Sequence, residues 1–129
     1  MLRFSIGGML LVAALPACAS RQPSPGELQP VVTDRLYFGR NIGNQLGVTD
    51  SAWAVFVRDV VSARLDGFTL WAAEGSWKGT REPVFVLEVL HAERSASTDS
   101  AIVAIIGEYK RRFNQESVLR VVTTGRGSY

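Results

Sequence analysis

Between residues 33 and 129, stretches with the apolar spacing of a helix alternate with runs that have the composition of a strand, and this order predicts the secondary structure. In two stretches apolar residues recur every three or four positions, which is the spacing of an amphipathic helix. The apolar stripe of the first stretch consists of Trp53, Phe56, Val57, Val60 and Val61, and that of the second consists of Ile102, Ile105, Ile106, Tyr109 and Phe113. We therefore expect two helices, each with one face packed on a core.

Polar residues set the expected ends of these helices. Thr49 or Asp50 can cap the first helix, because either side chain can accept a hydrogen bond from a free N–H group of the first turn. Residues 66–67 (Asp-Gly) end it. Residues 97–99 (Ser-Thr-Asp) offer a cap for the second helix, and Asn114 can adopt the left-handed conformation that closes a helix.

Four other runs have the composition of β-strands, rich in β-branched and aromatic residues and bounded by turn residues. They are residues 34–40 (DRLYFGR), 67–77 (GFTLWAAEGSW), 84–90 (VFVLEVL) and 117–124 (SVLRVVTT). A turn at residues 78–81 joins the second run to the third. The order along the chain is therefore strand, helix, strand, strand, helix, strand.

This order predicts an α+β domain of the ferredoxin-like βαββαβ type. Right-handed crossovers place both helices on one face of a four-stranded antiparallel sheet, with the strands in the order 4-1-3-2. The other face of the sheet is left uncovered, so its side chains are the first place to look for function.

The alternation of side chains along each strand predicts which residues lie on this open face. Glu88 marks it in the third strand, because a charge is unfavourable beneath two apolar helices. Arg35 and Tyr37 are the outward pair of the first strand, and Glu74 shares one face of the second strand with Leu70 and Ala72. For the fourth strand, the same reasoning assigns Val118, Arg120, Val122 and Thr124 to the open face. Tyr37, Glu74, Glu88 and Arg120 are thus the candidate binding residues.

Two interpretations of such a face stay open. It can be a solvated or dimer-buried surface on which Arg120 and Glu88 balance each other's charge. It can also be one wall of a cavity closed by a second subunit, where Arg120 would hold an anionic group and Glu88 would act as an acid or base. His91 falls on the inward side at a strand end, which is typical of a histidine at the edge of the core.

Composition excludes several classes of function. With 14 Lys and Arg against 12 Asp and Glu, the chain of 129 residues has a formal charge of +2, and removing residues 1–17 lowers this to +1. A nucleic-acid binder would instead cluster basic residues on one face, and the basic run at residues 110–112 suits the negative end of a helix dipole. One cysteine and one histidine allow neither an intrachain disulfide nor a usual Cys/His metal site. We expect no metal, no cofactor and no nucleic-acid partner.

The first seventeen residues have the features of a secretory signal peptide. Arg3 supplies a positive start, and residues 6–15 are ten uncharged, mostly apolar residues, too few for the roughly 20 that cross a bilayer. Residues 15–18 (Leu-Pro-Ala-Cys) resemble a bacterial lipobox with Cys18 as the lipid attachment point, although Pro16 departs from the usual pattern. The alternative is cleavage after Ala19, which would release a soluble periplasmic protein.

Residues 18–32 are rich in Pro, Ser and Gly, as expected of a flexible tether. An anchored protein would then carry a single domain, residues 33–129, on the periplasmic side of the outer membrane. Its partners would be the membrane, through the lipid, and an unknown protein or small ligand. A homodimer is also an option.

Several short segments resemble an uncharacterised bacterial family of small exported proteins that carry a domain of unknown function. These segments are LYFG (36–39), DGFTL (66–70), GSW (75–77), Glu82 and YKRRFNQESVLRV (109–121). The resemblance implies export, often as a lipoprotein, and a compact fold with helices and strands. It implies no activity.

The sequence therefore favours a binding module that uses the open sheet face. The alternative is a small cofactor-independent enzyme that works in a dimer cavity through Glu88, Tyr37 and Arg120.

Overall fold

The structure is a computed structural model, and it describes residues 24–92 and 95–128. The expected signal peptide (1–17) and Cys18 lie outside the described residues. The elements are β1 Gln29–Gly39, β2 Asn41–Ile42, β3 Gln45–Leu46, α1 Asp50–Phe56, the π-helical turn η1 Val57–Val61, β4 Thr69–Trp77, β5 Thr80–Ala92, α2 Ala96–Phe113 and β6 Leu119–Gly127.

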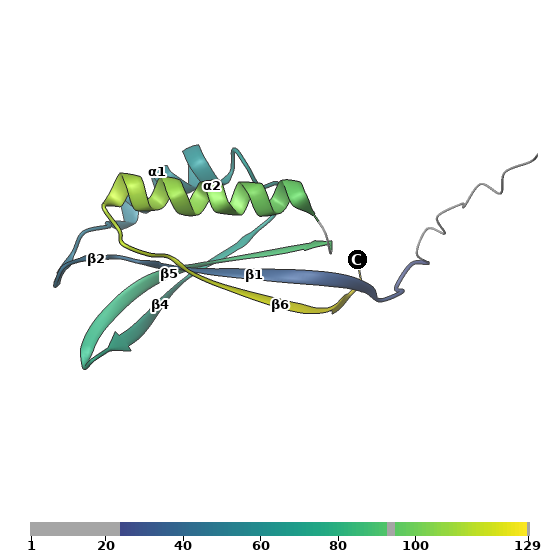
Figure 1. Cartoon of the computed structure of the whole chain (residues 1–129), viewed down its shortest axis with the longest axis horizontal. Helices are drawn as coiled ribbons and strands as arrows, with labels where there is room; N and C mark the ends of the chain where they lie inside the picture. Colours follow the sequence, from purple (N-terminus) through teal and green to yellow (C-terminus); the bar gives the residue numbers. More distant parts are fainter. Residues whose placement is uncertain (1–23, 93–94, 129) are drawn as a thin grey trace, which may run out of the picture.

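The four long strands form one antiparallel sheet, in the order β4-β5-β1-β6. Counted along the chain, this is second, third, first, fourth, which is the expected 4-1-3-2 read from the other edge. Helices α1 and α2 both lie on one side of the sheet (Figure 1). The fold is therefore mixed α+β, with two helices against a four-stranded antiparallel sheet.

The first helix begins as predicted, because the Thr49 hydroxyl oxygen accepts a hydrogen bond of 3.2 Å from the backbone N–H of Ala52. It ends earlier than residues 66–67, since the α-helix ends at Phe56 and the π-helical turn that continues it ends at Val61. Within it, Trp53, Phe56, Val60 and Val61 are buried, which confirms four positions of the predicted stripe.

The second helix begins at Ala96, before the predicted cap at residues 97–99. Its cap residue is Ser95, whose side chain makes no capping hydrogen bond. Its end is confirmed: Asn114 has φ 49° and ψ 46°, the left-handed conformation, and the chain turns there towards β6.

Two tight turns shape one end of the sheet. Lys78 and Gly79 both have positive φ, 50° and 78°, and they join Trp77 to its partner Thr80 in a two-residue β-hairpin turn. A second, very short hairpin pairs β2 with β3 and turns at Gly43. The sequence patterns did not predict this second hairpin, because two-residue strands have no detectable periodicity.

The first strand begins at Gln29, so residues 29–32 of the expected tether belong to the sheet. Val31 pairs with Gly125 on one side and with Ala92 on the other. Val31 and Val32 are both buried. The sequence did not predict this part of the strand, because a proline at position 30 is more typical of a linker.

The core between helices and sheet is built around an aromatic cluster. Phe38 lies 5.2 Å from Trp53 and 4.7 Å from Tyr109, measured between ring centroids. The Trp53 ring stacks on Phe85 at 4.5 Å. Among the described helices, none is long and apolar enough to span a membrane.

Candidate functional site

The sheet register separates the four predicted site residues. Tyr37 pairs with Val86, and Glu88 pairs with Arg35, so both lie on the open face as predicted. Arg120 instead pairs with Leu36, whose side chain is fully buried beneath the helices. The prediction that Arg120 shares a face with Glu88 is therefore wrong.

The physical reason lies in the partners of Arg120. We expected a charged side chain to avoid the helix side, but two carboxylates neutralise this one. Its guanidinium donates to Asp34 at 2.5 Å and to Asp99 of α2 at 2.6 Å. The position of Arg120 on an edge strand also leaves a quarter of its side chain exposed.

Glu74 does not share the open face with Glu88 either, so its predicted place on that face is also wrong. It pairs with Pro83 in the sheet register and belongs to the parity set of the helix side, near the tip of the β4–β5 hairpin. Its carboxylate forms an ion pair with Arg81. Hydrogen bonding from Arg81 holds the pKa of Glu74 below its ordinary value.

The open face carries an ion pair set among apolar side chains. Arg35 donates from Nε to the Glu88 carboxylate at 2.9 Å, and its guanidinium lies 5.7 Å from the centre of the Trp71 ring. Val86 is fully buried on this face, between its register partners Tyr37 and Trp71. Trp71, Leu90 and Val121 are more than a third exposed there.

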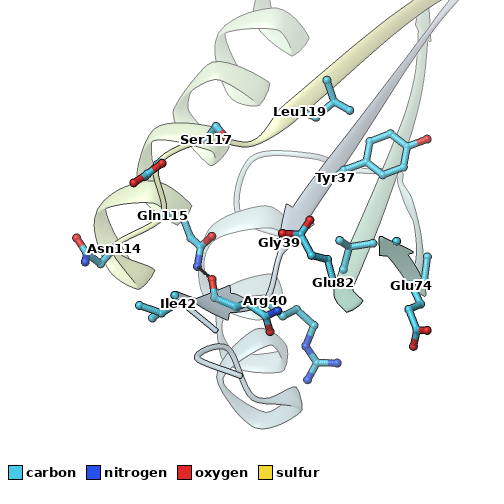
Figure 2. Close-up of a pocket in the computed structure, with 16 residues that line it drawn as sticks. Tyr37, Gly39, Arg40, Ile42, Glu74, Glu82, Asn114, Gln115, Ser117 and Leu119 are labelled. Atoms are coloured by element: carbon cyan, nitrogen blue, oxygen red, sulfur yellow. Dashed lines mark hydrogen bonds between the residues drawn. The ribbon is translucent and has the colours of Figure 1, made fainter. Parts of the chain in front are cut away.

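An open groove of about 970 Å³ lies at one end of this face. It forms where β1 ends at Gly39 while the β4–β5 hairpin continues past it (Figure 1). Its floor comes from the open face of the sheet, and the α2–β6 connection closes its other side (Figure 2). The floor residues are Tyr37, Gly39, Gly75, Glu82, Val84 and Leu119.

Partly buried hydrogen bonds hold the wall of the groove in place. The Tyr109 hydroxyl donates to the Gly39 carbonyl at 2.7 Å, and the Gln115 amide nitrogen donates to the Asn41 carbonyl at 2.9 Å. Burial raises the pKa of Tyr109, so its phenol stays protonated and able to donate. The chain therefore leaves β1 along a fixed path, and the amide nitrogen of Gln115 supports the groove wall.

Charge is distributed unevenly over the groove. The Arg40 guanidinium is already engaged, because it donates to Asp50 at 2.6 Å and to the Val48 carbonyl at 3.0 Å while it lies over the Phe85 ring. Glu82 differs: within the described part of the chain, no hydrogen bond or ion pair involves its carboxylate. Figure 2 shows this carboxylate turned into the groove, whereas Glu74 points away from the Gln115 side. The groove therefore offers an unpaired negative charge beside the Tyr37 side chain.

Most segments that carry the family resemblance meet at this groove. LYFG contributes Tyr37 and Gly39, GSW contributes Gly75, and Glu82 lies on the floor. The YKRRFNQESVLRV segment supplies residues 114–117. Sequence reasoning named these segments without placing them together, because only the sheet register and the α2–β6 turn bring them into contact.

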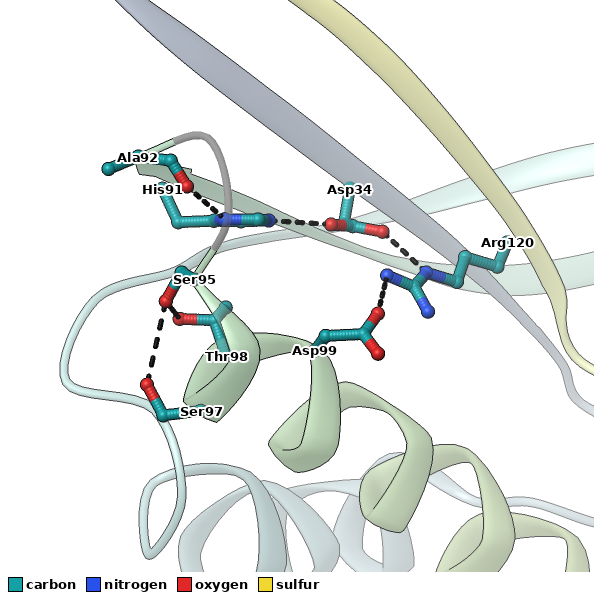
Figure 3. Close-up of polar contacts among 8 residues, drawn as sticks. All are labelled: Asp34, His91, Ala92, Ser95, Ser97, Thr98, Asp99 and Arg120. Atoms are coloured by element: carbon teal, nitrogen blue, oxygen red, sulfur yellow. Dashed lines mark hydrogen bonds and ion pairs between the residues drawn. The ribbon is translucent and has the colours of Figure 1, made fainter.

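A second polar cluster, which the sequence did not predict, lies on the helix side of the sheet (Figure 3). Asp34 is fully buried and accepts hydrogen bonds from Arg120 and from His91 Nε2, at 2.5 and 2.8 Å. The other ring nitrogen of His91 lies 2.9 Å from the Ala92 carbonyl. Since both ring nitrogens face acceptors, both bonds form together only when both nitrogens carry protons.

Opposing effects act on the Asp34 carboxyl. Burial raises its pKa, but hydrogen bonds and charge attraction from Arg120 and His91 outweigh burial, and the pKa lies below its ordinary value. Asp34 has the same parity as Leu36 and Phe38, which could have placed it inward. The cluster joins β1, β5, β6 and α2, and it is satisfied internally, so it serves the fold. Among the described residues, no three His, Cys, Asp or Glu side chains are placed to hold a metal ion.

The chain belongs to a family described as "Protein of unknown function (DUF3574)", whose model matches residues 33–129. This confirms the expected domain of unknown function. No curated protein sequence matches the chain.

Two solved structures of a phage SAM lyase share the fold. The lyase in complex with S-methyl-5'-thioadenosine has 16% sequence identity and a TM-score of 0.56, and the match covers 85% of this chain and 95% of the lyase. The lyase in its apo state has 17% identity and a TM-score of 0.54, with 85% and 97% covered. At this identity, the likeness concerns the fold alone.

Proposed function

We propose that this chain is a non-enzymatic binding module that holds a small ligand with a cationic group in the groove at the end of its open sheet face. The observation that carries the proposal is the unpaired Glu82 carboxylate turned into a groove of about 970 Å³. That volume is at the upper end of the range for small-molecule sites.

The chemistry of the lining selects the ligand class. An anion would meet Glu82 and would find the Arg40 guanidinium already engaged by Asp50. A cation would be attracted to Glu82 and could contact the face of the Tyr37 ring, a favourable arrangement for an ammonium or guanidinium group. Val84 and Leu119 add apolar surface for the rest of the molecule.

Nuclear magnetic resonance with ethylguanidinium as the probe tests this site. The uncharged analogue ethylurea, which has nearly the same shape, is the control. We expect ethylguanidinium to shift the backbone amide signals of residues 37–39, 82, 84 and 114–117, and ethylurea to leave them in place. Equal shifts with both compounds, or shifts confined to other residues, would contradict the proposal.

An enzyme is the second candidate, since the fold is shared with a SAM lyase. The predicted catalytic set of Glu88, Tyr37 and Arg120 loses one member, because Arg120 lies on the other side of the sheet from Glu88. Tyr37 and Glu82 remain as acid or base groups within the groove. Incubation with SAM followed by mass spectrometry decides between the candidates: we expect SAM to be recovered intact, whereas S-methyl-5'-thioadenosine or another breakdown product would favour the enzyme.

We infer in addition that the helices and strands follow the ferredoxin-like arrangement. The strand order β4-β5-β1-β6 and the two helices on one side of the sheet support this inference. The two connections that enclose the helices would then both be right-handed crossovers.

We also propose that the chain is exported and anchored through Cys18 to the outer membrane, facing the periplasm. The signal-like residues 1–17 and the lipobox-like residues 15–18 support this proposal. Ten residues separate Cys18 from Gln29, so the domain would lie within about 35 Å of the membrane. The groove lies at the Gly39 end of β1, about 33 Å further along. The mass of the mature chain tests the anchor: acyl chains on Cys18 support it, and a chain beginning at Ser20 contradicts it.

A further inference from the structure

We propose that the open face of the sheet is a self-association surface, on which a second copy of this chain packs face to face. The surface concerned, here termed the open-face patch, consists of Arg35, Trp71, Glu88, Leu90 and Val121. The groove opens at the Gly39 end of the same face, so a face-to-face dimer would also cover part of its floor, but the proposal does not depend on the proposed ligand.

The patch is apolar at its flanks. Trp71, Leu90 and Val121 are 38%, 49% and 39% exposed in a single copy, and they come from three different strands. Exposed apolar side chains that gather on one face mark an interaction site when the patch is large enough.

The charges at the centre of the patch are self-complementary. Arg35 and Glu88 are directly opposite each other in the β1–β5 register and form an ion pair. Arg35 is 44% exposed at its side chain, so it can make further contacts beyond Glu88. A two-fold axis beside this pair would place Arg35 of each copy against Glu88 of the other, as an isologous interface requires. A partner with a single sign of charge would leave one of the two groups unmatched, and a second copy matches both.

The area of the sheet suits such an interface. Four strands of about nine residues cover roughly 30 Å by 19 Å. Two copies together would therefore bury roughly 1,100 Å², which passes the approximate 1,000 Å² expected of a specific interface.

Neighbouring residues of β6 provide a matched pair of variants. Val121 and Val122 are both exposed, at 39% and 52%, but they point to opposite faces because Val121 pairs with Arg35 and Val122 pairs with Asp34. Val121→Glu should weaken dimerisation about tenfold or more, since it places a carboxylate in the interface. Val122→Glu should leave it unchanged.

Native mass spectrometry of the whole chain in mild detergent, over a series of concentrations, measures the dimer. A wild-type protein that stays monomeric throughout overturns the proposal, and so does Val122→Glu if it dissociates the dimer as much as Val121→Glu does. The latter result would place the interface on the free edge of β6.

Charge reversal shows whether the two copies meet at the central pair. Arg35→Glu leaves two carboxylates there and Glu88→Arg leaves two guanidinium groups, so each variant alone should be monomeric. An equimolar mixture should form a dimer with one copy of each, identified by its mass. If the mixture stays monomeric while thermal unfolding shows both variants folded, the central pair is not at the interface and the proposal fails.

Discussion

Asp34 is the fully buried carboxylate that holds Arg120 and His91 on the helix side of the sheet. Replacing it with asparagine would leave the Arg120 and His91 side chains without their shared carboxylate. Breaking a buried ion pair in this way costs about 3 kcal/mol of unfolding free energy, at the lower end of the usual range because Arg120 is partly exposed. Chemical denaturation of Asp34→Asn measures the loss, and Asp66→Asn, at an exposed position, is the control.

The same carboxyl should make stability depend on pH. Its pKa in the folded state lies below the ordinary value of 3.8, so its contribution is fully present above that value. It is lost as the pH falls through the lowered pKa of the folded state. The free energy of unfolding should therefore fall less steeply with acid in Asp34→Asn than in the wild type. Parallel slopes would show that the carboxyl is not paired.

The Tyr109 hydroxyl supports the groove through its hydrogen bond to the Gly39 carbonyl at the end of β1. Tyr109→Phe removes the hydrogen bond to the Gly39 carbonyl and should cost about 1–2 kcal/mol of unfolding free energy. Tyr37→Phe, in the open groove, should cost almost nothing. Because burial raises the pKa of Tyr109, its phenol should also titrate above the ordinary range of tyrosine in an alkaline absorbance titration. Equal losses in the two variants would contradict the assigned roles.

At the scale of the element, the end of α2 sets the position of Gln115. Asn114 has a positive φ, a conformation that glycine adopts without strain and alanine does not. Asn114→Ala should lower the unfolding free energy by about 1 kcal/mol, whereas Asn114→Gly should change it little. Thermal unfolding of the two variants checks this, and equal melting temperatures would show that the turn does not need the left-handed conformation.

The elements also show how far the sequence predicts this molecule. The helix stripes are long enough to define a period, so both helices and their buried faces were predictable, as was the left-handed end at Asn114. The side of the sheet that Arg120 faces was not predictable, because its own charge is the only local signal in the fourth strand and that signal favours the open face. Its partner Asp34 is 86 residues away in the chain, and no local pattern joins them. The groove was not predictable either, because it depends on where β1 ends relative to the β4–β5 hairpin, and these segments are distant in the sequence.

At the scale of the whole molecule, the start of β1 at Gln29 distinguishes the folded domain from the segment that matches the family. A chain that begins at residue 33 would lack Val31 and Val32, which are buried near the start of the central strand β1. At about 1.5 kcal/mol for each valine, it should be less stable by about 3 kcal/mol than a chain that begins at residue 24. Denaturation of the two chains measures the difference, and equal midpoints would show that residues 29–32 do not belong to the folded domain.

The Glu82 carboxylate is the group in the groove that should attract a cationic ligand. Calorimetric titration of ethylguanidinium into the wild type and into Glu82→Gln tests it directly, with Glu108→Gln on α2 as a control, because Glu108 pairs with Arg111 away from the groove. We predict that binding is at least about tenfold weaker in Glu82→Gln and unchanged in the control. Equal binding in all three proteins would show that the groove does not use this carboxylate, and the proposed cationic ligand would lose its support.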